Sequence, residues 1–189
     1  DYFNDMSSDV DPLIRNAILH YQFESIHPFY DGNGRTGRIL MVLHLVLSGR
    51  LDLPILFISG YINEHRSEYY RLLREVTSAG AWKPWILYVL NAIEVQAHST
   101  AKTIDAMLAL RNSLEPAMRA IKPAIPVKEI TEYLLSNPFY SRERLSESLS
   151  VHPNSSLKYL NALEKAGLVK SFIVKKEKVF FMERLLSLL

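Results

Sequence analysis

The segment SIHPFYDGNGRTGRILMVLHLVL, from Ser25 to Leu47, sets a cluster of polar and charged side chains directly before an apolar run. The apolar part, from Ile39 onward, has the composition of a buried helix. Charged groups are costly to bury, and a core needs none of them. A cluster of polar and charged side chains directly before a buried helix therefore indicates a functional site.

The composition is that of a globular protein with a core. The chain has 189 residues, of which 48% are hydrophobic, enough for one ordinary domain and a small second one. It has no cysteine, which excludes disulfides, thiolate metal sites and a cysteine nucleophile. Its longest apolar run is too short to span a bilayer, and its acidic N-terminus does not resemble a signal peptide. These features predict a soluble, cytoplasmic protein with no membrane partner.

The two ends of the chain differ in charge. Residues 1–120 hold 11 Lys and Arg against 13 Asp and Glu, whereas residues 121–189 hold 11 against 7. The net charge of +2 therefore comes from a basic C-terminal part, which favours contact with a polyanion there.

Apolar residues recur at helical spacing along most of the first 120 residues. They predict helices over the ranges 12–26, 35–48, 59–80 and 81–122. The first begins with Pro12 in its first turn and ends at about Ser25 or Ile26, because Pro28 disfavours helical geometry at His27. The last range is expected to form one long helix or two, interrupted near Pro116.

Pro123 and Pro126 mark a boundary, after which the pattern changes to shorter elements. Three short helices and a two-stranded hairpin are expected, over the ranges 127–137, 141–150, 155–168 and 169–182. The predicted fold is mainly α, with a helical domain over residues 1–121 followed by a small α+β domain over residues 122–189.

The loop between the first two predicted helices is suited to binding an anion. Gly32 and Gly34 flank Asn33, so that the backbone can adopt positive φ and approach a ligand closely. The loop leads into a helix, whose first N–H groups and positive dipole end favour an anion. Arg35 and Arg38 stand three residues apart on that first turn and can face the same phosphate.

Two further residues add chemistry to this anion site. Asp31 is an oxygen ligand beside it, the usual arrangement for Mg²⁺ shared with a nucleotide. His27 is a side chain suited to proton transfer at neutral pH. A base, a metal ligand and an anion site together predict transfer from a phosphate ester to a hydroxyl group. The plainer alternative is a glycine-rich turn with charged neighbours.

The stretch HPFYDGNGRTGR, residues 27–38, resembles the signature of Fic-domain proteins, His-x-Phe-x-(Asp/Glu)-Gly-Asn-Gly-Arg-x-x-Arg, at every specified position. The helical layout over residues 11–97 also resembles the Fic core. Most members of that family transfer AMP from ATP to hydroxyl groups of proteins. The resemblance implies a Fic-type nucleotidyltransferase that uses ATP and Mg²⁺ and acts on a target protein.

The resemblance also implies roles for individual residues. His27 is expected to deprotonate a target Ser, Thr or Tyr, and Asp31 to bind Mg²⁺ between the α- and β-phosphates. Phe29 is expected to pack into the core and hold the loop, and Arg38 to lie nearest the γ-phosphate. The residues expected to contact ATP phosphates are Gly32, Asn33, Gly34, Arg35 and Arg38.

Adenine contacts are predicted from aromatic residues further along the chain. Tyr69 and Tyr70 are the main candidates, with Tyr61 and Trp82 as further ones. The alternative is that these aromatic rings belong to the core.

Two parts found in many Fic proteins are not recognised in this sequence. None of the glutamates has Ser or Thr four residues before it, as the inhibitory Ser/Thr-x-x-x-Glu motif requires. The chain begins at Asp1, too late for the hairpin that docks the target. The sequence therefore predicts a Fic domain that is incomplete at its N-terminus, or one regulated by another chain.

Residues 127–184 resemble a winged helix-turn-helix module. Its second helix is expected to expose Ser155, Ser156, Lys158, Asn161 and Lys165 toward DNA. Its wing is expected to carry Lys175, Lys176 and Lys178. DNA binding, homodimerisation and docking of a target protein all remain open for this module.

Protein adenylylation is thus the leading prediction, and two alternatives remain. One is a DNA-binding transcriptional regulator whose Fic site only senses a nucleotide. The other keeps the enzyme but changes the chemistry, to removal of AMP or to transfer of another phosphate-containing group.

Overall fold

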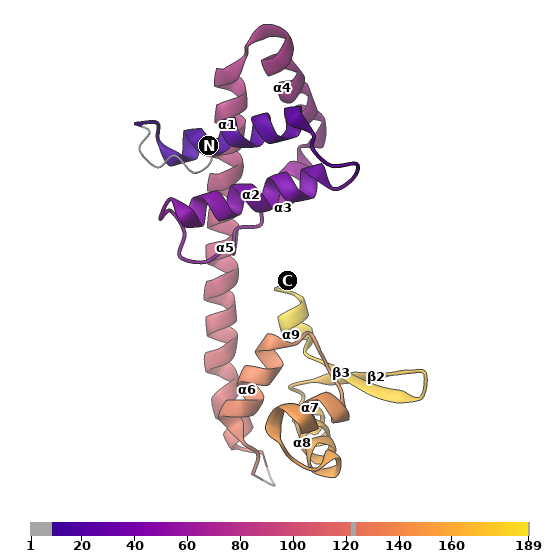
Figure 1. The fold of residues 1–189 in the computed structure, drawn as a ribbon. Coiled ribbons are helices and arrows are strands. Elements are labelled where there is room, and N and C mark those ends of the chain that lie inside the picture. The colour runs from indigo at the N-terminus through magenta and orange to yellow at the C-terminus, as the bar shows by residue number, and fades with distance from the viewer. Residues whose placement is uncertain (1–8, 122–123, 189) are drawn as a thin grey trace. The chain divides into compact units, whose positions relative to one another are not determined.

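A computed structural model describes residues 9–121 and 124–188 of the chain. The chain divides into two compact units, residues 1–101 and residues 102–189, and each is considered by itself (Figure 1). The predicted domain boundary at residues 121 and 122 lies later along the chain, and it stays a prediction. Of the two prolines taken to mark it, Pro123 lies outside the described residues.

The first unit is built on two adjacent helices, α1 (Pro12–Ile26) and α2 (Asn33–Leu47), which lie side by side (Figure 1). Helix α1 begins as predicted, with Pro12 in its first turn and the Asp11 carboxylate accepting a hydrogen bond from the Leu13 N–H at 2.8 Å. Asn16 fixes the two helices together, since its amide nitrogen donates to the Met41 carbonyl at 2.7 Å. The loop that carries the signature therefore joins two firmly packed helices.

The single helix predicted over residues 59–80 is two helices, α3 (Ile58–Glu64) and α4 (Arg66–Ala79). The break falls at His65, whose backbone leaves helical geometry at φ −113° and ψ 35°. Its imidazole ring stacks on Tyr61 at 4.0 Å, and its Nδ1 lies 3.0 Å from the Tyr61 carbonyl oxygen. A side chain that bonds to the backbone in this way competes with the helix, which a periodicity pattern does not reveal.

Helix α5 (Trp82–Arg119) is continuous through Pro116, so the one-helix alternative is confirmed. In the first unit, its Trp85 is fully buried, and the indole N–H donates to the Ala17 carbonyl at 2.9 Å. Trp85 thereby joins α5 to α1 in the core of this unit. No helix in the described part of the chain is both long and apolar enough to cross a bilayer.

The second unit contains short helices and a small sheet. The three predicted helices are α6 (Val127–Ser136), α7 (Arg142–Leu149) and α8 (Pro153–Lys165). The predicted hairpin is β2 (Lys170–Val174) and β3 (Glu177–Phe181). Two elements were not predicted, β1 (Phe139–Tyr140) and α9 (Glu183–Leu186).

The sheet of this unit is antiparallel, with strand order β1-β3-β2. Tyr140 of β1 is paired with Phe180 of β3, and both side chains are fully buried. The Tyr140 hydroxyl donates to the Leu134 carbonyl at 2.9 Å, which joins the sheet to α6. A mainly α fold with a small C-terminal α+β part is therefore confirmed, whereas the winged helix-turn-helix assignment stays a prediction.

Candidate active site

His27 lies at the C-terminal end of α1 in a left-handed conformation, with φ 51° and ψ 55°. Its N–H completes the helix by donating to the Phe23 carbonyl at 3.0 Å, and its side chain is exposed. A residue with a side chain pays about 1–2 kcal/mol for this conformation, and such strain is often found at functional sites. The backbone therefore turns at His27 and presents its imidazole to solvent at the start of the loop.

Asn33 holds the loop together from within. Its side chain is buried, and its amide nitrogen donates to the Phe29 carbonyl at 2.6 Å while its amide oxygen accepts from the Phe29 N–H at 2.9 Å. The expectation that Phe29 packs into the core is wrong, because this side chain is 50% exposed and has its ring against Phe23 at 6.3 Å. Polar contacts to the Phe29 backbone, and not its ring, fix the loop. The Asn33 side chain is therefore committed to the protein, so that only its backbone faces a ligand.

Glycines at two positions let charged groups lie close to the backbone. Gly32 has φ 86°, a left-handed conformation that suits glycine. A Cβ at Gly34 would come within 3.0 Å of Arg38 Nη1, so that glycine leaves room for the guanidinium over the first turn of α2. The Arg38 Nε donates to the Ser59 Oγ at 2.9 Å, which fixes the guanidinium plane. Sequence reasoning missed Ser59, since nothing in the pattern placed the start of α3 beside α2.

Asp31 and Arg35 form an exposed ion pair, with 3.3 Å between Asp31 Oδ2 and Arg35 Nη2. The other carboxylate oxygen of Asp31 accepts from the Gly32 N–H at 2.7 Å. Arg35 and Arg38 line one pocket of about 380 Å³, together with Ser59 at the start of α3. Both arginines thus face a single cavity, as their spacing predicts.

The two candidate adenine residues point to different places. Tyr69 is buried in the core, where its hydroxyl lies 2.9 Å from His20 Nε2 and burial raises its pKa well above the usual range. Tyr70 is half-exposed and lines a pocket of about 270 Å³ with His27 and Glu24. Successive helical residues point about 100° apart, so only one of the two can face this pocket. The structure brings Tyr70 to His27 and keeps Tyr69 away from it.

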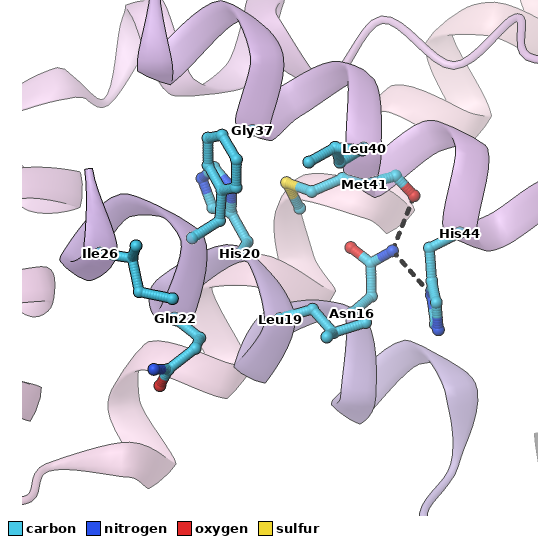
Figure 2. Close-up of a pocket in the computed structure, with 10 residues that line it drawn as sticks. Asn16, Leu19, His20, Gln22, Ile26, Gly37, Leu40, Met41 and His44 are labelled. Carbon is cyan, nitrogen blue, oxygen red and sulfur yellow. Dashed lines mark hydrogen bonds between the residues drawn. The ribbon is translucent and has the colours of Figure 1, made fainter. Parts of the chain in front are cut away.

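A second pocket of about 270 Å³ lies between α1 and α2, and Figure 2 shows the residues that line it. Its walls are mainly apolar, but they include Asn16, His20 and His44. The pKa of His20 falls from 6.5 to about 3, first because the ring is buried and second because the positive charge of Arg38 lies near it. His20 is therefore held in its neutral form inside the protein.

Asp31 can hold Mg²⁺ only if a bound nucleotide and water provide the other ligands. No group of three or more His, Asp or Glu side chains able to hold a metal ion occurs among residues 9–121 and 124–188. Mg²⁺ in nucleotide sites commonly takes one or two carboxylates, completing its shell with water and phosphate oxygens. A single exposed carboxylate beside two arginines fits an ion that arrives with a nucleotide.

The candidate DNA-contact residues of the second unit are only partly available. The expected exposure of Ser156 is wrong, because this side chain is fully buried and its hydroxyl donates to the Arg142 carbonyl at 2.7 Å. Lys158 is exposed, whereas the Asn161 amide oxygen accepts from Lys178 Nζ at 3.2 Å.

The wing lysines differ in the same way. Lys178 is also paired with Glu164 at 2.6 Å, so that its charge is compensated within the unit. Lys175 and Lys176 form the exposed tip of the hairpin between β2 and β3, where both have positive φ. DNA binding through these residues stays a prediction.

The helix–loop–helix arrangement, with an exposed histidine at one end of the loop and two arginines facing one cavity at the other, is that of a Fic-type fold. A Fic family protein from Desulfovibrio desulfuricans, known from a crystal structure, resembles this chain in fold, with a TM-score of 0.50 and 22% identity over 96% of this chain and 52% of that one. The model of the Fic/DOC family matches residues 1–45. This match to the Fic/DOC family includes the loop of residues 27–38.

Two relatives are similar enough in sequence to compare directly. The protein adenylyltransferase fic-1 of Caenorhabditis briggsae is 36% identical over 139 residues, 70% of this chain and 25% of that protein. The protein of the same name from Caenorhabditis elegans is 41% identical over 110 residues, 57% of this chain and 19% of that protein. The chain thus spans a quarter or less of the length of these relatives.

Proposed function

We propose that this chain transfers AMP from ATP to a hydroxyl group of a target protein. The observation that carries the proposal is the loop of residues 27–38, which sets His27 at the end of α1 and two arginines on the first turn of α2. The relatives named protein adenylyltransferase support the same activity. This function uses the charged residues of the loop and the exposure of His27, both of which a simple turn leaves unexplained.

The reaction follows from these positions. The oxygen of a target Ser, Thr or Tyr attacks the α-phosphorus of ATP, and His27 takes the proton of that hydroxyl. A new oxygen–phosphorus bond forms, the bond between the α-phosphorus and its bridging oxygen breaks, and pyrophosphate leaves. Such transfers need mainly positioning and neutralisation of phosphate charge, which is what an arginine-lined cavity supplies.

The remaining site residues bind the nucleotide. Arg35 and Arg38 hold the outer phosphates, and the backbone N–H groups of Asn33 and Gly34, at the start of α2, contact phosphate oxygens. Tyr70 stacks on adenine in the pocket that it shares with His27. Asp31 would hold Mg²⁺, and the bound ion would neutralise phosphate charge.

Incubation with ATP radiolabelled at its α-phosphate tests the proposal. Purified wild type and His27→Ala are each added to a cell extract with Mg²⁺, and ATP affinity is measured for both. Label on protein with the wild type alone is the expected result. Binding of ATP by both without labelled protein would instead favour the nucleotide-sensing regulator or the reverse reaction.

A further inference from the structure

Glu24 is a half-buried acidic group beside the site, and the proposed reaction provides no role for it. It lies on the last turn of α1, three residues before His27, and both side chains line the pocket that contains Tyr70. Its Oε1 is shielded from solvent and has no hydrogen-bond partner among the described residues. A buried carboxylate oxygen left without a donor is costly, so its retention requires an explanation.

Gly37 of α2 provides the space that Glu24 occupies. A Cβ built at Gly37 would lie 2.6 Å from Glu24 Oε1 and 3.1 Å from the His20 ring. Any residue other than glycine would therefore displace the carboxylate. His20 and Glu24 stand four residues apart on the same face of α1, so α2 accepts both through this one glycine.

The positive charges that act on this carboxylate belong to residues of the proposed active site. Burial raises the pKa of Glu24, while the positive charges of Arg38 and His27 oppose that rise. Arg38 directly follows Gly37 in α2, and His27 ends α1. The carboxylate thus shares a pocket with His27 and lies against Gly37, the residue before Arg38.

We propose that Glu24 is a positioning residue, whose negative charge stabilises the imidazolium formed when His27 takes the proton and opposes the binding of phosphate near Arg38. This inference rests on the proposed function for its effect on the rate. The effect on ATP affinity can be measured whether or not the protein transfers AMP. The charge of Glu24 thus has opposite effects on two quantities. It raises the rate of the chemical step, and it lowers the affinity for ATP in the ground state.

The test compares wild type, Glu24→Gln and Glu94→Gln at about pH 8. Glu94 is exposed on α5 and makes a matched control, since its replacement removes the same charge away from the site. For Glu24→Gln, the expected result is a kcat lower by about tenfold together with ATP binding tighter by roughly threefold. Glu94→Gln should change neither quantity.

Damage to the fold would lower both kcat and ATP affinity, so weaker binding in Glu24→Gln overturns the proposal, as does an unchanged dissociation constant. Glu24→Asp keeps the charge and should bind ATP as the wild type does. If the wild type transfers no AMP, the proposed function fails, while the comparison of ATP affinities still decides the role of Glu24.

Discussion

The side-chain amide of Asn33 pairs with the backbone of Phe29, donating to its carbonyl oxygen at 2.6 Å and accepting from its N–H at 2.9 Å. This pairing closes the loop between α1 and α2 on itself, while the Phe29 ring is half-exposed. A buried polar contact therefore determines the shape of the loop. The other residues of the loop do not have to pack into the core, and they can face a ligand.

Replacing Asn33 with alanine should open this loop. Asn33→Ala removes two hydrogen bonds and leaves the Phe29 backbone groups unsatisfied, which should lower the free energy of unfolding by about 2–3 kcal/mol. Urea denaturation measures the change. Asn63→Ala, at an exposed position of α3, is the control and should cost much less. A loss of under about 0.5 kcal/mol for Asn33→Ala would show that the loop is held by other contacts.

Ser59 should affect ATP binding through Arg38. The Arg38 Nε donates to Ser59 Oγ at 2.9 Å, so Ser59→Ala frees the guanidinium to rotate. We expect the dissociation constant for ATP to rise about fivefold, with that for AMP unchanged because AMP lacks the outer phosphates. Arg38→Ala should show the same selectivity with a larger effect. Equal losses for ATP and AMP would contradict the placement of Arg38 at the outer phosphates, and Ser67→Ala serves as a control.

The neighbouring tyrosines of α4 should behave differently. Tyr70→Ala removes the exposed ring beside His27 and should weaken binding of both ATP and AMP about tenfold, as expected for a lost base stack. Tyr69→Phe removes only the hydroxyl that meets His20 in the core. It should lower stability by about 1 kcal/mol and leave nucleotide affinity unchanged. Isothermal calorimetry with AMP decides between the two, and the reverse pattern would move the adenine site.

His20 should make the protein sensitive to acid. The unfolded chain binds a proton at this residue below about pH 6.5, whereas the folded protein does so only near pH 3, where the pKa of His20 lies. Stability is therefore lost as the pH falls through this window, by up to about 3 kcal/mol between pH 7 and pH 4. Urea denaturation of His20→Gln should show a correspondingly smaller loss than the wild type. Parallel pH profiles would mean that His20 binds a proton as readily in the folded protein as in the unfolded chain.

Local patterns predicted the parts of this structure that depend on neighbouring residues. Helix α1 follows from Pro12 and Pro28, and the loop follows from the glycines around Asn33. The shared cavity of Arg35 and Arg38 follows from their spacing on one helical turn. Each of these features is determined within a few residues of chain.

Features that depend on distant contacts were missed. Tyr69 and Tyr70 are equivalent in sequence, and only the packing of α4 against α1 decides which of them is buried. Ser156 was expected on the surface, but it is fully buried and bonds to the carbonyl of Arg142 on α7. Glu24 acquires its environment from Gly37, a residue on another helix. Periodicity does not report such pairings between elements.

Transfer of AMP by His27 and its loop is tested most directly with two radiolabelled forms of ATP, one labelled at the α-phosphate and one at the γ-phosphate. Each is incubated with the wild type or His27→Ala, with Mg²⁺ and a cell extract that provides target proteins. AMP transfer by this site predicts that the wild type adds labelled protein, above the labelling in extract alone, from the α-form and not from the γ-form, and that His27→Ala adds none. Added label from the γ-form, or equal added labelling by His27→Ala, would contradict AMP transfer by this site.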